Sequence, residues 1–248
     1  MIFTIAAREL RSLFLSPLAW AILAVTQFIL AWLFLAQIDT WLTLQPRLAA
    51  IEGAPGVADV VVAPLLANAG TVLLLITPLI TMRSLSDEYR GRTISLLFSA
   101  PVSMTEIVLG KYLGILGFFL VMLLMLALMP LSLLVGTDLD LGKLVAGLLG
   151  LALLLSAFAA IGLYMSSLTE QPVVAAVTTF GLLLLLWIIN EAGTTQAGGI
   201  MSYLSMLSHY QALLKGVFNS MDAAYYVLVV VLFIGFTIRR LDATRLPH

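Results

Sequence analysis

The sequence contains no cysteine, and only 10% of its residues are charged. The absence of cysteine excludes disulfides, zinc–thiolate sites and iron–sulfur clusters. The chain is 62% hydrophobic with a mean hydropathy of +1.11, whereas a soluble domain is about half apolar and a quarter charged. The net charge of -1 argues against a nucleic-acid partner, which would need a clustered basic face. The composition therefore places the chain among membrane proteins.

Ionisable residues are missing from the interior of every predicted span. Ion-coupled carriers need such groups, or broken helices, to bind the coupling ion. The two histidines, His209 and His248, lie in connections without a partner at the spacing of a zinc protease, so we interpret His209 as an interfacial polar residue. No G-x-S-x-G motif occurs either. We predict no catalytic residue, no metal site and no enzymatic activity.

A P-loop for ATP is also missing. The nearest stretch, GTDLDLGK at 136–143, has five residues between its glycines instead of four. Leu144 follows where Ser or Thr would bind magnesium. We therefore predict no cofactor on this chain, and the energy for any uphill transport must come from another one.

Six apolar runs approach the roughly 20 residues that a helix needs to cross a bilayer. The last is charge-free only over 223–238, so it needs tilting or help from flanking residues. We predict an all-α polytopic membrane protein with a single transmembrane domain, 1–248. Its spans are expected at about 17–38, 61–82, 112–135, 144–168, 172–190 and 223–239.

Residues 2–15 precede the first span and form a predicted amphipathic helix. Apolar residues fall on one face at about 100° per residue, and Arg8, Arg11 and Ser12 fall on the other. Such a helix can lie in the headgroup plane, with Arg8, Glu9 and Arg11 as its charged residues. Ser16-Pro17 should end it, because proline disfavours the helical conformation in the residue before it.

Lysine and arginine are distributed unevenly between the two sets of connections. The set with both termini and 83–111 carries nine, and the other set carries Arg47, Lys143 and Lys215. The positive-inside rule then puts both termini and 83–111 in the cytoplasm. The nine are Arg8, Arg11, Arg83, Arg90, Arg92, Lys111, Arg239, Arg240 and Arg245.

The charged segment, residues 83–111, carries seven of the charged side chains between two apolar spans. Glu88 precedes Arg92 by four residues, which favours a helical ion pair. We predict a helix over about 84–98 that ends at Ala100-Pro101. Ser103, with Glu106 as its capping-box partner, should start a second short helix.

Weaker signals leave alternatives open. Glycine pairs at 110/114 and 147/150 permit close helix packing, within the subunit or across a dimer. Polar span residues such as Gln27, Ser156 and Thr179 favour interhelical hydrogen bonds over a substrate path. Apolar residues at helical spacing predict a helix in the 191–222 connection: Tyr203, Leu204, Leu207, Tyr210 and Leu214.

Residues 78–114, PLITMRSLSDEYRGRTISLLFSAPVSMTEIVLGKYLG, resemble the signature of ABC-2-type membrane permeases. AARELRSLFLSPLAW (6–20) and LSHYQALLKGVFNSMDAAYYV (207–227) are most similar to the gliding-motility, GldF-like branch. The sequence departs from the pattern at Arg92 and Ser95.

The resemblance implies a permease subunit in the bacterial inner membrane, with ATP bound by a separate ATPase subunit on the cytoplasmic face. It implies an N-terminal elbow helix, a coupling helix that docks into the ATPase, and a permease dimer, most simply a homodimer. An additional periplasmic or membrane subunit is left open. Charge reversal at Glu88 is expected to weaken docking without unfolding the permease. The coupling role falls on Asp87, Glu88, Tyr89, Arg90, Arg92, Thr93 and Leu97.

Two other functions remain open at this stage. A stand-alone channel or carrier would transport in liposomes without an ATPase. A non-transporting scaffold of a secretion or motility assembly would keep the same charged segment but move nothing.

Overall fold

The computed structural model describes residues 1–48, 54–91, 102–137, 139–192, 204–216 and 219–245. Over these ranges the chain is helical and contains no strand. Six helices are long and apolar enough to cross a membrane, which confirms the predicted all-α polytopic fold. The elements are α1 (Ile2–Leu15), α2 (Pro17–Leu48), η1 (Ala58–Val62), α3 (Ala63–Thr81), α4 (Ser86–Arg90), α6 (Met104–Leu131), η2 (Ser132–Val135), α7 (Leu141–Ser167), α8 (Pro172–Ala192), α10 (Met206–Leu214) and α11 (Ser220–Arg245).

Helix α7 is the most buried of the six long helices and packs against α3, α6, α8, α10 and α11. Small residues allow this crowding. A Cβ at Gly147 would lie 2.5 Å from Leu66 Cδ1, and one at Gly150 would lie 2.9 Å from Leu213 Cβ. The 147/150 glycine pair therefore serves packing of α7 on α3 and α10 within the chain.

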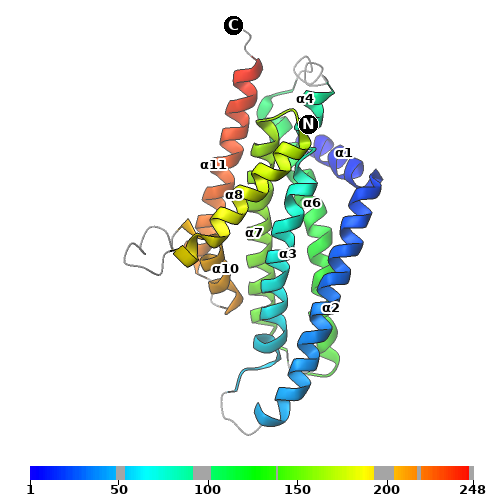
Figure 1. Ribbon diagram of the computed structural model, residues 1–248, viewed down its shortest axis with the longest axis vertical. Helices are drawn as coiled ribbons and strands as arrows, with labels where there is room; N and C mark the ends of the chain where they lie inside the picture. Colours follow the sequence, from blue (N-terminus) through cyan, green and yellow to red (C-terminus); the bar gives the residue numbers. More distant parts are fainter. Residues whose placement is uncertain (49–53, 92–101, 138, 193–203, 217–218, 246–248) are drawn as a thin grey trace.

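Helix α1 lies across one end of the bundle against α6 (Figure 1). A Cβ at Gly110 would lie 2.6 Å from Ile5 Cβ, and one at Gly114 would lie 2.7 Å from Glu9 Cβ. These glycines let the two helices approach closely, so the second glycine pair also acts within the chain.

The junction of α1 and α2 follows the sequence prediction. Ser16 is extended, with φ -79° and ψ 128°, and α2 begins at Pro17. Trp20 Nε1 donates a hydrogen bond to Phe14 O at 2.8 Å across this bend. The bend turns the amphipathic α1 away from the axis of the first spanning helix (Figure 1).

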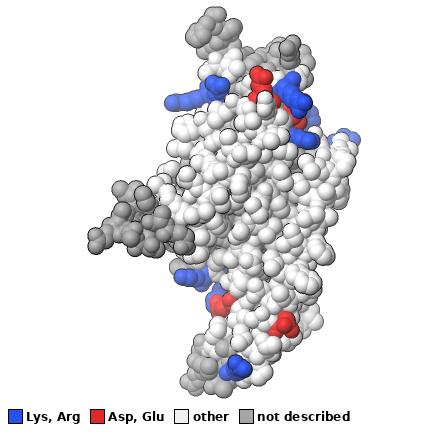
Figure 2. Space-filling model, in the orientation of Figure 1, with Lys and Arg blue, Asp and Glu red and all other residues white. Residues whose placement is uncertain are grey.

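The N-terminus and the last turn of α11 lie at the same end of the molecule as α4 (Figure 1). On the face that Figure 2 shows, charged side chains gather at the two ends, and the middle of this face shows no Lys, Arg, Asp or Glu. An uncharged band between two charged ends is what a bilayer-spanning bundle requires, since charge is costly in the hydrocarbon core.

The predicted helix in the long connection is α10. Its buried Tyr210 donates a hydrogen bond to Leu66 O at 2.7 Å, and Tyr226 of α11 donates to Met206 O at 2.8 Å. Past its end, Gly216 has φ +78°, a left-handed conformation that suits glycine at the end of a helix.

His209, which the sequence predicts to be an interfacial polar residue, has a partner inside the bundle. His209 is buried, stacks on Tyr225 with ring centroids 4.3 Å apart, and has Nδ1 2.6 Å from Asp222 Oδ1. The sequence reading missed this because the partner lies on the next helix, beyond the turn.

Most polar side chains in the spans form hydrogen bonds to carbonyl oxygens of their own helix. Ser156 and Thr179 donate to carbonyl oxygens three and four residues back. Gln27 of α2 instead donates to Met122 O of α6 at 3.1 Å. The interhelical hydrogen bond predicted for Gln27, Ser156 and Thr179 is therefore present for Gln27. The two hydroxyl groups instead bond to a backbone carbonyl in their own helix, as Ser and Thr can do.

Candidate coupling site

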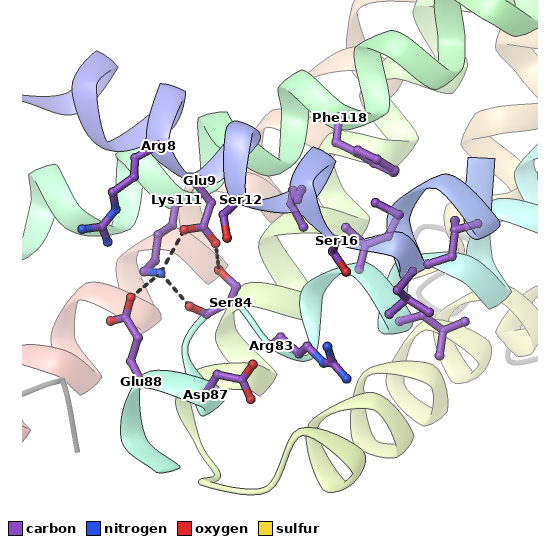
Figure 3. Close-up of a pocket in the computed structure, with 16 residues that line it drawn as sticks. Arg8, Glu9, Ser12, Ser16, Arg83, Ser84, Asp87, Glu88, Lys111 and Phe118 are labelled. Carbon is purple, nitrogen blue, oxygen red and sulfur yellow. Dashed lines mark hydrogen bonds and ion pairs between the residues drawn. The ribbon is translucent and has the colours of Figure 1, made fainter. Parts of the chain in front are cut away.

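A buried lysine joins three elements at the end of the bundle that carries both termini. Lys111 of α6 is only 2% exposed, and its Nζ lies 2.7 Å from Glu88 Oε1 of α4 and 3.2 Å from Glu9 Oε2 of α1 (Figure 3). The same Nζ donates to Ser84 O at 2.7 Å. All three ammonium donors are thereby used, as a buried lysine requires.

Local sequence explains why Lys111 points inward. Ser103 caps α6 by accepting from Glu106 N at 3.2 Å, and Glu106 Oε2 accepts from Ser103 N at 3.1 Å. The predicted capping box is thus confirmed, although it starts the long helix α6 and not a separate short helix. From that start, Lys111 falls on the buried stripe of α6 with Ile107 and Ile115.

The elbow helix delivers Glu9 to this lysine because α1 crosses α6 over glycine. Glu9 Cβ is the atom nearest to a Cβ built at Gly114, so a larger residue there would displace the carboxylate. The Ser84 hydroxyl also reaches Glu9 Oε1, at 3.4 Å. The predicted charged residues of the elbow therefore divide, with Glu9 facing inward and Arg8 and Arg11 exposed.

A single serine fixes the turn between α3 and α4 onto the end of α7. Ser166 Oγ donates to Met82 O at 3.0 Å and accepts from Leu85 N at 3.0 Å and Ser86 N at 3.1 Å. A hydroxyl has one proton and two lone pairs, so this side chain is fully used. The start of α4 is consequently attached to α7 as well as to α6.

The predicted coupling residues are placed differently from one another. Asp87 and Arg90 are exposed on α4, whereas Glu88 faces Lys111 and Tyr89 is half-buried with a buried hydroxyl. Arg92, Thr93 and Leu97, with the second half of the helix expected at about 84–98, lie outside the described residues. Of the described coupling residues, Asp87 and Arg90 are thus best placed to meet a partner.

Because Glu88 pairs with buried Lys111, charge reversal at Glu88 is expected to destabilise the permease, contrary to the expectation from sequence. A lysine there would place a second cation beside the buried Nζ of Lys111. The sequence pattern assigned no site role to Lys111, Ser84 or Ser166. One signal for Lys111 was available: it continues the apolar spacing of Met104, Ile107 and Val108, so the helix buries it.

A pocket of about 470 Å³ lies beside the ion pairs of Lys111 with Glu9 and Glu88, between α1, α2, α3, α4 and α6. Charged residues line one part of it, and apolar residues of α2, α3 and α6 line the other (Figure 3). Within the described part of the chain, no group of three or more His, Cys, Asp or Glu residues could hold a metal ion.

The sequence comparison agrees with this arrangement of six apolar helices, an N-terminal helix α1 and the short α4. Residues 3–244 match the sequence profile of the ABC-2 family transporter proteins. The chain belongs to this family. The search of curated proteins gave no match. Membership makes the chain a multi-pass membrane component of an ABC transporter, a family that is generally not itself catalytic and that associates with an ABC ATPase subunit.

Proposed function

We propose that this ABC-2 permease is the membrane-spanning half of an exporter of the bacterial inner membrane, with α4 as the docking point of its ATPase. Both termini and α4 would then face the cytoplasm, as the lysine and arginine bias suggests. ATP would bind to the partner subunit alone. The sequence segments at 6–20 and 207–227 favour the GldF-like branch, and a homodimer is the simplest assembly.

The observation that carries this proposal is the three-way attachment of α4. Glu88 connects it to Lys111 of α6, Lys111 connects to Glu9 of α1, and Ser166 connects the preceding turn to α7. An element that merely joined two spans would need none of these buried links. A force applied to Asp87 and Arg90 would reach three helices.

The mechanism follows from this arrangement. Closure of the ATPase dimer on ATP would move two copies of α4 together. Because α4 is attached to α6 and α7, these helices would move with it as rigid bodies, and α1 would follow through Glu9. The displacement would change the contact between the two permeases, where the substrate path is proposed to lie.

Exposed α4 residues provide the test. The double variant Asp87→Lys, Arg90→Glu should reduce co-purification of the ATPase and its stimulation by the permease, because it exchanges charges on the docking face. The matched control is Arg47→Glu with Asp39→Lys, both exposed near the other end of α2. Equal ATPase recovery from the two double variants would contradict the docking assignment.

The scaffold and channel alternatives are separated by reconstitution. Proteoliposomes holding the permease and its co-purified ATPase should show ATP hydrolysis that depends on the permease and that vanadate inhibits. Hydrolysis unaffected by the permease would favour a scaffold. Solute flux through the permease alone would favour a stand-alone channel.

A further inference from the structure

The pocket beside α1 combines two chemistries that a water-filled crevice would not need. Its floor and one wall are apolar, from Ala19 and Ile22 of α2, Ile80 of α3 and Phe118 of α6, all of them buried. Its other wall is charged. The volume of about 470 Å³ falls within the range of roughly 300–1,000 Å³ typical of small-molecule sites. The lining suits an amphiphile with a polar head and a hydrocarbon stem.

The charges on the polar wall balance. The lining holds three basic residues and three acidic ones: Arg8, Arg83, Lys111, Glu9, Asp87 and Glu88. Lys111 is already paired with Glu9 and Glu88. Within the described residues, Arg8, Arg83 and Asp87 make no ion pair, so they are free to meet a ligand. The residues left for a ligand are two arginines and one carboxylate, which suits a headgroup that carries both a phosphate and an ammonium group.

The residues of both signs reach the pocket from α1, from α4 and from the turn before α4. In Figure 3, Arg83 extends beneath Ser16, and Asp87 lies between Arg83 and Glu88, while Arg8 lies beyond Lys111. Arginine is well suited to phosphate because its planar guanidinium donates two parallel hydrogen bonds. The Asp87 carboxylate, which lines the same pocket, suits a primary ammonium group. Leu79 and Ile80, at the end of α3 just before Arg83 in the chain, belong to the apolar part of the lining.

We propose that this pocket binds one zwitterionic phospholipid carrying a primary amine. Its phosphate diester lies on Arg83 and Ser16, its ammonium lies on Asp87, and the start of its acyl chains lies against Ala19, Ile22 and Ile80. The lipid fills the space under the elbow helix and adds a contact between α1, α2 and α4. The site requires only that the bundle is in a membrane; assigning the lipid to the cytoplasmic leaflet rests on the proposed orientation.

Native mass spectrometry of the delipidated permease tests the site without any ATPase. Phosphatidylethanolamine added back should give one tightly held adduct, and phosphatidylglycerol should bind more weakly. Arg83→Gln should lower the population of the adduct about tenfold, the effect expected for losing a charge-assisted contact of about 1.4 kcal/mol. Arg47→Gln, at the far end of α2, is the matched control. Glycerophosphoethanolamine, which lacks chains, should not compete.

Two further variants make the assignment specific. Asp87→Asn should remove the preference for phosphatidylethanolamine over phosphatidylglycerol, and Ala19→Phe should reduce binding of both lipids by filling the apolar end. Each variant is first checked for an unchanged elution profile and Tm. Equal retention by Arg83→Gln and Arg47→Gln, tighter binding of phosphatidylglycerol to the unmodified chain, or competition by the soluble headgroup would each overturn the proposal. Because these readouts involve no ATPase, they do not depend on the proposed coupling function.

Discussion

Glu88 lies 2.7 Å from Lys111, although one stands near the start of the charged segment and the other at its end. This ion pair attaches α4 to α6. It also directs the Glu88 carboxylate into the bundle, so that Glu88 does not face the proposed ATPase. Lys111 also pairs with Glu9 of α1, so a single lysine connects α1, α4 and α6. A buried lysine with two carboxylates is sensitive to the loss of any member.

Replacing the lysine should therefore unfold the end of the bundle more easily. Lys111→Met keeps the length of the side chain but leaves Glu9 and Glu88 facing each other without a cation. We expect a loss of about 3 kcal/mol in stability, the lower end for a broken buried pair because both carboxylates keep some exposure. The Tm in detergent reports it, with exposed Lys215→Met as the control. Equal Tm values for both variants would show that the ion pair contributes nothing.

Variants of Glu88 and Asp87 should distinguish the stability of the permease from its docking to the ATPase. Glu88→Lys should lower the Tm at least as much as Lys111→Met, because it adds a second cation beside a buried one. Asp87→Lys, one residue earlier and exposed, should change the Tm little and weaken ATPase co-purification instead. Thermal stability and co-purification are measured on both variants in parallel. The reverse pattern would mean that Glu88 contacts the ATPase.

A methyl group at Gly114 should push the elbow helix off α6. Its Cβ would lie 2.7 Å from Glu9 Cβ and 3.2 Å from Ala6 O, too close for either helix to stay in place. Because the chain has no cysteine, Leu10→Cys can be used as the single reporter of α1 docking. Gly114→Ala should speed maleimide labelling of this cysteine about tenfold, the effect of weakening the contact by about 1.4 kcal/mol.

The control for that experiment is Gly235→Ala in α11, where a Cβ meets nothing within 4 Å. This change should leave labelling unchanged and raise stability slightly, since alanine favours a helix over glycine by up to about 1 kcal/mol. Equal labelling rates in the two alanine variants would mean that α1 is not held by its contact with Gly114.

Features set by neighbouring residues could be predicted from the sequence. The break at Ser16-Pro17, the Ser103–Glu106 capping box and the helix around Tyr210 depend on a few adjacent side chains. The six spans follow from apolar runs long enough to cross a bilayer. In each case the physical cause is contained within one stretch of the chain.

The candidate site could not be predicted in the same way. Glu9, Glu88 and Lys111 come from three separate elements, and nothing in the local pattern says which carboxylate meets which cation. Glu88 had a plausible helical partner in Arg92 by spacing alone. The contact of Lys111 with Glu88 of α4 depends on how α3 and α6 each pack against α7. Lys111 entered the sequence argument only as one of nine basic residues that set the orientation, although the inward stripe of α6 continues through it.

The His209–Asp222 pair should matter for α10 and not for the coupling end. Asp222→Ala removes the carboxylate that lies 2.6 Å from His209 Nδ1 across the α10–α11 turn. We expect α10 to detach more readily, by about 1–3 kcal/mol for a buried charge-assisted bond. Met206→Cys, fully buried at the start of α10, reports the opening by its maleimide labelling rate. Exposed Asp39→Ala is the control. Faster labelling with unchanged ATPase co-purification is the expected result, whereas labelling at the control rate would show that the pair does not hold α10 in place.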